Sequence, residues 1–150
     1  MIVGDAGRVF GVVEIQGIER FERWLRSYRS RAMTSVAEAY AAAFDRALDA
    51  AGDRTPEKRG SLKRSRWRGS PTVLGDRFDV LGGYSAGHAW VNHEIDRPHP
   101  RGRWKFLSSA IDEAAPGMAL RVAEDAGRAL ASGGEFRASP RYPGSPGVVA

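Results

Sequence analysis

The sequence predicts an α+β fold, in which a long N-terminal helix and C-terminal helices pack on a small, mainly antiparallel sheet. Apolar residues recur with a period near 3.6 over residues 18–51, which is typical of one amphipathic helix. Short runs rich in β-branched and aromatic residues then cluster between residues 61 and 95, separated by turn-forming residues. Helical periodicity returns after residue 104. Strands grouped between helices, rather than alternating with them, favour the α+β class.

The first expected elements are a short strand and the long helix. Residues 9–15 are largely β-branched and are followed by Gly17, so we expect a strand there. No Gly or Pro interrupts residues 18–51, which would form a helix ~50 Å long at 1.5 Å per residue. Gly52 is its expected C-terminal cap, and residues 30–35 are the weakest point, where the helix can kink or break. The apolar face of a helix this long is more than a small domain can easily cover. The helix therefore either bends around its own sheet or packs partly on a neighbouring subunit.

The middle of the chain predicts strands, and the last third predicts helices. The expected strands cover residues 61–68, 72–74, 77–81 and 89–95, with a hairpin turn at Gly75 and Asp76. Residues 97–102 have the composition of a loop. A helix is expected to start near Trp104, and Pro116 with Gly117 is expected to divide it into two segments.

Length and composition predict one domain and a tail. The 150 residues would form a single domain over residues 1–132, followed by a Gly- and Pro-rich flexible tail over residues 133–150. The absence of cysteine excludes disulfides and thiolate ligands. No apolar stretch approaches the ~20 residues that span a bilayer, and residues 1–10 do not resemble a signal peptide. We therefore expect a protein made in the cytoplasm with no membrane partner.

Positive charge is concentrated in two clusters. The net charge is +5, but residues 54–68 carry seven basic residues against one acid, and residues 97–105 carry four against none. Two interpretations stay open, a solvated face and a surface that binds nucleic acid or an acidic partner. The candidate contacts are Lys63, Arg64, Arg66 and Arg68. Trp67 and Trp104, each flanked by basic residues, would either stack on bases or face the core while their neighbours face solvent.

Candidate chemistry is sparse, and we expect neither an enzyme nor a cofactor. Three histidines and one acid, His88, His93, Glu94 and His99, form the only cluster that suggests a metal or an acid–base site. On a strand, His88 and His93 would point to opposite faces and could not ligate one ion. No Gly-x-Ser-x-Gly elbow accompanies them, and residues 82–87 lack the Lys-Ser/Thr ending of a phosphate-binding loop. A small hydrolase therefore has little support.

The junction between the long helix and the strands has the pattern Pro-x-x-x-Gly-x-Leu-x-x-Ser, formed by Pro56, Gly60, Leu62 and Ser65. Pro56 would end the helix because its ring clashes with helical backbone. Gly60 would supply a positive φ for the turn that follows. These four residues are expected to have structural roles.

Three motifs in order resemble one protein family. They are this junction, the His-Ala-x-Val-x-x-Glu segment at residues 88–94, and Trp104-Lys105-Phe106-Leu107 at the start of a C-terminal helix. Together they resemble the minor-capsid or tail-completion proteins of the neck of long-tailed bacteriophages, over residues 9–131. Arg59 stands where that family usually has Thr, and Ile95-Asp96 where it commonly has Gly.

The resemblance implies a non-enzymatic virion protein that is assembled in the host cytoplasm and sits at the head–tail interface. It would form a homo-oligomeric ring that joins the DNA-filled head to the tail, contacting neighbouring neck and tail proteins and, non-specifically, packaged DNA. Trp104, Phe106 and Leu107 would anchor the last helix for assembly. The alternative, from a different class, is a stand-alone basic nucleic-acid-binding protein that uses residues 54–68.

Overall fold

The computed structural model describes residues 2–4, 8–10, 18–56, 60–96, 98, 102–139 and 141–144. The chain divides into two compact units, Met1–Ser30 and Arg31–Ala150. Helix α1 (Ile18–Arg54) contributes residues to both units, and the second unit contains helices α2 to α4 and strands β3 to β6. The core described below therefore belongs to the second unit.

The first unit contains a short hairpin and the first turns of α1. Strands β1 (Ile2–Gly4) and β2 (Arg8–Phe10) pair antiparallel, with Val3 opposite Val9. The strand predicted at residues 9–15 is confirmed at residues 9–10, and residues 11–15 lie outside the described part of the chain. Residues 19–30 of α1 are all exposed.

Helix α1 is continuous over 37 residues, so the predicted helix is confirmed and has no break at residues 30–35. The hydroxyl of Ser35 does not compete with the helix, because it is buried and accepts a hydrogen bond from the Phe136 amide at 3.1 Å. The expected cap at Gly52 is wrong, since the helix runs on to Arg54. Gly52 is instead where the Arg66 guanidinium crosses the helix, and a Cβ there would lie 2.8 Å from Arg66 Cζ.

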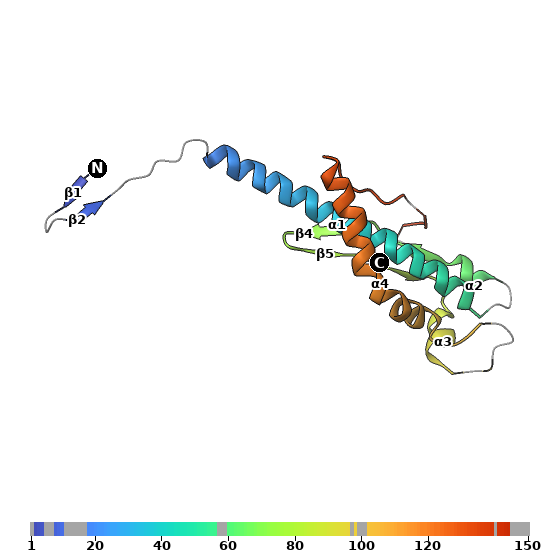
Figure 1. The fold of residues 1–150 in the computed structure, drawn as a ribbon. Helices are drawn as coiled ribbons and strands as arrows, with labels where there is room; N and C mark the ends of the chain where they lie inside the picture. The colour runs from blue at the N-terminus through green and yellow to red at the C-terminus, as the bar shows by residue number, and fades with distance from the viewer. Residues whose placement is uncertain are drawn as a thin grey trace. The chain divides into compact units, whose positions relative to one another are not determined.

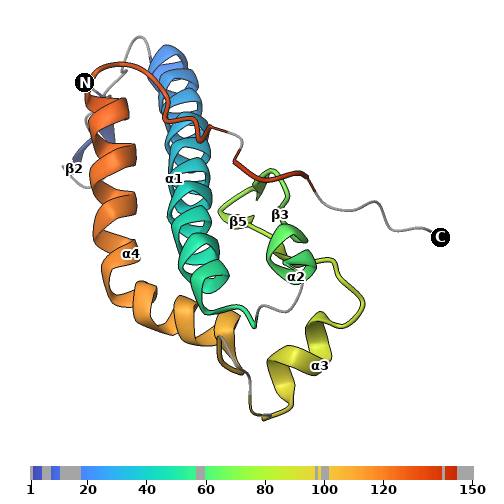
Figure 2. The same ribbon diagram turned by 90° about the vertical axis from the view of Figure 1, so that its right-hand side faces the viewer.

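The core of the second unit lies between α1 and α4 (Phe106–Ala131), which run side by side in Figure 2. Small residues of α1 face larger ones of α4, which allows the two helices to approach closely. The buried cluster consists of Ala39, Ala43, Met118, Val122 and Ala126. Val36, Phe44, Ala114 and Phe136 are partly buried and pack against it.

The strands of the second unit form two small antiparallel sheets. Strand β3 (Arg66–Arg68) pairs with β6 (Gly82–Tyr84), placing Trp67 opposite Gly83. Strands β4 (Thr72–Leu74) and β5 (Arg77–Asp79) form the predicted hairpin, and Gly75 adopts φ 66° in its turn. This hairpin lies along α1, where the Tyr40 and Phe78 rings are 5.5 Å apart (Figure 1). The α+β class is therefore confirmed.

Three predicted strands are wrong or shortened, and one of them is the strand expected at residues 77–81, which ends at Asp79. Residues 61–64 form helix α2 (Ser61–Arg64), and only residues 66–68 of the expected strand at 61–68 are extended. Residues 89–94 form helix α3 (Ala89–Glu94) instead of a strand. Their Trp and Val side chains favour strands locally, but tertiary contacts override that preference, because His93 packs edge-on against the Phe106 ring at 5.1 Å.

Helix α4 passes through Pro116 without ending, so the predicted division into two segments is wrong. Pro116 is exposed, and water can therefore solvate the carbonyl that its missing N–H leaves unpaired. Figure 2 shows α4 changing direction along its length, as expected of a helix that contains proline.

The segment after α4 contacts α1 along its described part. The Phe136 amide donates to Ser35 Oγ, and the Ala138 amide donates to Glu38 Oε2 at 3.3 Å. Further on, Tyr142 donates a hydrogen bond to Asp49. The division into a domain over residues 1–132 and a tail over residues 133–150 stays a prediction, but these contacts were not indicated by composition.

Candidate assembly surfaces

The junction motif is built around a left-handed turn. Gly60 has φ 67°, as its place in the motif predicts, and it precedes the short helix α2. Leu62 is 3% exposed, so α2 docks through this side chain. Ser65 Oγ donates to the Leu62 carbonyl at 2.7 Å and closes the turn. Pro56 follows the end of α1, while residues 57–59 lie outside the described part of the chain.

Arg68, one of the candidate DNA contacts, is buried inside the second unit. Its Nε lies 2.6 Å from Asp45 Oδ1 of α1, and the two side chains are 7% and 4% exposed. Its Nη1 also donates to the Gly69 carbonyl at 2.9 Å. A guanidinium bound in this way secures β3 to α1 and is not presented to a partner.

Arg66 is also directed at α1. Its Nε donates to the Lys63 carbonyl, and its Nη1 donates to the Leu48 carbonyl at 3.1 Å. Nη1 also reaches the Tyr142 hydroxyl at 3.1 Å and lies 3.5 Å from Asp49 Oδ1. The Arg66 guanidinium stacks over the Tyr142 ring, 5.1 Å from its centroid, and so joins α1, β3 and the C-terminal segment.

Burial raises the pKa of the Tyr142 hydroxyl, and its hydrogen bond to Asp49 raises this pKa further. The phenol therefore stays protonated and remains a donor to Asp49. Burial likewise raises the pKa of Tyr84, whose hydroxyl lies 3.0 Å from Thr55 Oγ1. Both tyrosines act as neutral hydrogen-bonding groups of the fold rather than as titrating groups.

The four candidate basic residues do not form one exposed surface. Lys63 is at the surface and lies 3.4 Å from Asp53, and Arg64 is exposed, whereas Arg66 and Arg68 point to α1. The expectation that the charged neighbours of Trp67 face solvent is wrong. Alternation along β3 places the two arginines toward α1 and leaves Trp67, half-buried, on the other face.

The three predicted anchor residues occupy different environments. Phe106 is 1% exposed and meets the Tyr84 ring edge-on at 5.0 Å. Leu107 is half-buried, whereas Trp104 is 39% exposed, with Lys105 Nζ 5.1 Å from its ring centroid. Phe106 is therefore the buried member of the three. The assembly role of all three stays a prediction.

His93 caps the start of α4. Its Nε2 accepts a hydrogen bond from the Ser108 amide at 3.3 Å, and its Nδ1 lies 2.5 Å from Glu94 Oε1. The Lys105 amide donates to the His93 carbonyl at 2.9 Å. These bonds give His93 a structural role, although it was predicted to lie on a strand.

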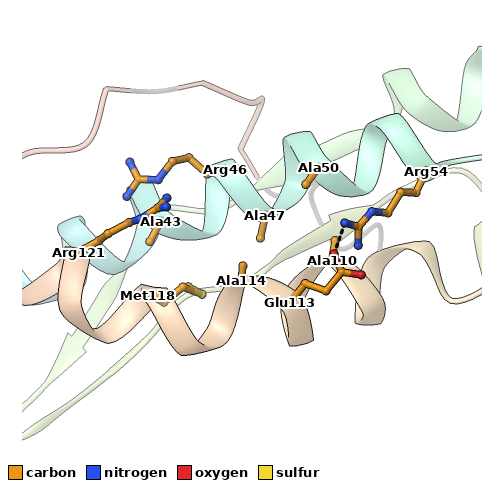
Figure 3. A pocket seen from close by; sticks show the side chains of 11 residues that line it. Ala43, Arg46, Ala47, Ala50, Arg54, Ala110, Glu113, Ala114, Met118 and Arg121 are labelled. Atoms are coloured by element: carbon orange, nitrogen blue, oxygen red, sulfur yellow. Dashed lines mark hydrogen bonds and ion pairs between the residues drawn. The ribbon is translucent and has the colours of Figure 1, made fainter.

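A groove of about 300 Å³ lies between α1 and α4 (Figure 3). Its floor is made of alanines and one methionine: Ala43, Ala47, Ala50, Ala110, Ala114 and Met118. Arg46, Arg54, Glu113 and Arg121 line its edges (Figure 3). The groove itself was not predicted from the sequence, although Ala110, Ala114 and Met118 are spaced four apart and so share one face of a helix.

Ion pairs at this groove are centred on Glu113. Arg54 donates to one carboxylate oxygen, and Arg103 Nη2 lies 3.0 Å from the other. The hydrogen bond from Arg54, and then that from Arg103, lowers the pKa of Glu113. Among the described residues, Arg46 Nε and Arg54 Nη1 are buried without a hydrogen-bond partner. The groove therefore combines an apolar floor with charged edges.

A second apolar surface lies on the first turns of α1, in the first unit. The rings of Phe21 and Trp24 stack at 5.9 Å, and those of Trp24 and Tyr28 at 5.6 Å. With Leu25, these side chains occupy one face of the helix and are 41% to 56% exposed. We call this set, Phe21, Trp24, Leu25 and Tyr28, the aromatic face. Exposed aromatic patches of this kind mark interaction sites.

In the described part of the chain, no group of three or more His, Cys, Asp or Glu side chains is placed so that it could hold a metal ion. His88 precedes α3 and His93 lies within it, while His99 is outside the described residues. In the part of the chain that the structure describes, no helix is both long and apolar enough to cross a membrane.

Comparison with known proteins finds no match, whether the chain is compared with protein-family models, curated proteins or solved structures.

Proposed function

We propose that this chain is a structural virion protein of a phage neck, which oligomerises in a ring and joins the DNA-filled head to the tail. The observation that carries the proposal is the order of motifs along the chain. A long helix, the junction at residues 56–65, the segment at residues 88–94 and the Phe106-Leu107 helix start follow one another as in the family they resemble.

Two surfaces described above support a role in assembly. The aromatic face leaves four large apolar side chains about half exposed, which is unfavourable unless a partner covers them. The groove between α1 and α4 adds an apolar floor with charged edges. As the resemblance implies, the proposed role is non-enzymatic, requires no cofactor and lies at the head–tail interface of the virion.

The alternative, a stand-alone nucleic-acid-binding protein, keeps Lys63 and Arg64 as its outward-facing candidates. Arg66 and Arg68 are already bonded to α1, which removes two of the four proposed phosphate contacts. Two phosphate contacts are few for a protein that must retain duplex DNA at physiological salt. We therefore favour the neck role.

The test is a head-to-tail joining assay. Filled heads and free tails that accumulate without this protein are mixed with the purified chain, and joined particles are counted by electron microscopy and by infective titre. We expect joining to depend on added chain and to saturate with it, and heat-unfolded chain serves as the control. Equal joining without the chain would exclude the proposal, as would stable binding of the chain to heads that leaves them unable to accept tails.

A further inference from the structure

We propose that the aromatic face is a self-association site, through which two copies of the chain pair as antiparallel helices. The starting observation is that Phe21, Trp24 and Tyr28 are already stacked along one face of α1. Pre-stacked rings lose little side-chain freedom on binding, which favours association. The inference concerns residues 19–30 alone and does not rest on the proposed function.

Charges beside the aromatic face indicate a second copy as the occupant. On one edge of the face lie Glu22 and Arg29, seven residues and about two helical turns apart. Both are exposed, and neither has an ion-pair partner among the described residues. When two such helices pack antiparallel, the edge that carries Glu22 and Arg29 faces the same edge of the other copy. The two edges run in opposite directions. Glu22 of each copy then lies opposite Arg29 of the other, which forms two equivalent ion pairs.

The orientation follows from the same charges. In a parallel pair each edge would face the opposite edge of the other copy, so Glu22 and Arg29 would not lie against each other. The antiparallel pair also places Phe21 against Tyr28 of the other copy, with Trp24 and Leu25 near the two-fold axis. Aromatic side chains near the centre of an interface contribute most of its affinity.

The area available predicts a weak pair. About half of each of three aromatic side chains is exposed, and a fully buried aromatic covers about 150–250 Å². The aromatic face with Leu25 would therefore bury on the order of 300–400 Å² per copy, which is below the size of a standard stable interface. We expect dissociation in the micromolar range or weaker, so that the pair can open when another partner competes for the aromatic face.

The experiment is sedimentation velocity over a concentration series, with circular dichroism to verify that each variant keeps its helix content. Wild-type chain is expected to show a monomer–dimer equilibrium. Trp24→Ala, Glu22→Arg and Arg29→Glu should each weaken dimerisation at least tenfold. Arg23→Glu is the matched control, because Arg23 lies on the far side of the helix and its charge reversal should leave the affinity unchanged.

The decisive measurement is the equimolar mixture of the Glu22→Arg and Arg29→Glu variants. In an antiparallel pair the mixture restores both ion pairs, so dimerisation should return to within about threefold of the wild-type affinity. A mixture that stays as weak as its components would overturn the proposal. So would a wild-type chain that stays monomeric at millimolar concentration, or one that forms rings through a contact insensitive to Trp24→Ala.

Discussion

The buried ion pair between Arg68 and Asp45 illustrates how single side chains connect the elements of the second unit. The sequence marks Arg68 as one of several basic residues on an expected surface, but the side chain crosses to α1 and is 7% exposed. A buried guanidinium without a carboxylate is strongly unfavourable, so the pair makes the position of β3 against α1 specific.

We predict that Asp45→Ala lowers the free energy of unfolding by about 3–5 kcal/mol, because it leaves the Arg68 charge buried and unpaired. Denaturant unfolding measures the change. The combined change of Asp45→Leu and Arg68→Met should cost much less, since no charge is then buried. Lys63→Gln, which removes an exposed pair, is the control and should cost less than about 1 kcal/mol. A loss below about 1 kcal/mol for Asp45→Ala would contradict this account.

Phe106 and Trp104 are close in sequence but should differ in their effect on stability. Phe106→Ala removes a side chain that is 1% exposed and should cost about 3–5 kcal/mol through lost burial and the cavity left behind. Trp104→Ala removes a side chain that is 39% exposed and should cost less than half as much. Thermal unfolding of both variants tests the difference. Equal losses would mean that the exposed tryptophan carries as much of the fold as the buried phenylalanine.

At the scale of elements, the loop before α4 reaches the end of α1 through backbone contacts. Gly102 has φ 85°, and the Arg103 amide donates to the Arg54 carbonyl at 2.9 Å. A Cβ on Gly102 would lie 2.7 Å from both the Arg54 carbonyl oxygen and Pro56 Cα. This position requires glycine for its conformation and for the close approach.

Gly102→Ala should therefore destabilise the protein by more than the conformational penalty alone. Gly133→Ala is the matched control, because Gly133 has φ 79° and a Cβ there would have no heavy atom within 4 Å. We expect about 1 kcal/mol for Gly133→Ala and at least twice that for Gly102→Ala. Chemical denaturation of both variants measures the two losses. Similar losses would show that the loop moves away from α1 without penalty.

The ion pairs of Glu113, at the edge of the groove between α1 and α4, should make the stability of the protein fall at acid pH. Bonds from Arg54 and Arg103 lower the pKa of Glu113 below its ordinary value of 4.5 in the folded chain. The folded state therefore binds the proton less well than the unfolded state, so this contribution is present above about pH 4.5 and is lost as the pH falls through the folded pKa. In Glu113→Gln, the fall in melting temperature on acidification should be smaller than in wild type. An unchanged acid dependence would exclude Glu113 as a contributor.

For the whole molecule, the arrangement of charge limits which basic residues of residues 61–68 could contact DNA. Arg66 and Arg68 are bonded to α1, so Lys63 and Arg64 remain as the candidate phosphate contacts of this segment. Each phosphate contact contributes about −0.9 to the slope of log affinity against log salt concentration. The two contacts together would therefore contribute roughly −2. A ring would multiply this contribution by the number of its subunits.

We predict that the isolated chain binds duplex DNA weakly and without base preference at about 150 mM salt. Changing Lys63 and Arg64 together to Gln should reduce the magnitude of the salt slope by about 2, while Arg121→Gln, a change on α4, is the control. Fluorescence anisotropy with labelled duplex measures both quantities. Sub-micromolar affinity or base discrimination would favour the stand-alone DNA-binding protein over the neck protein.

The sequence by itself determined the elements whose signal is local. The absence of Gly and Pro from residues 18–51 and their 3.6-residue period predicted α1, and Gly75 with Asp76 predicted the β4–β5 hairpin. The motif predicted the positive φ of Gly60, because a turn after Pro56 requires it. Clustered strands between helices predicted the α+β class.

Only the tertiary structure decided the features that depend on distant partners. Residues 89–94 are helical because His93 packs on Phe106 and caps α4, and this contact outweighs the strand preference of Trp90 and Val91. Arg66 and Arg68 face inward because α1 supplies the Leu48 carbonyl, Asp45 and Asp49, which are distant from them in sequence. A basic residue has the same local pattern whether water or a buried carboxylate is its partner, so charge alone could not predict which of the four basic residues stay on the surface.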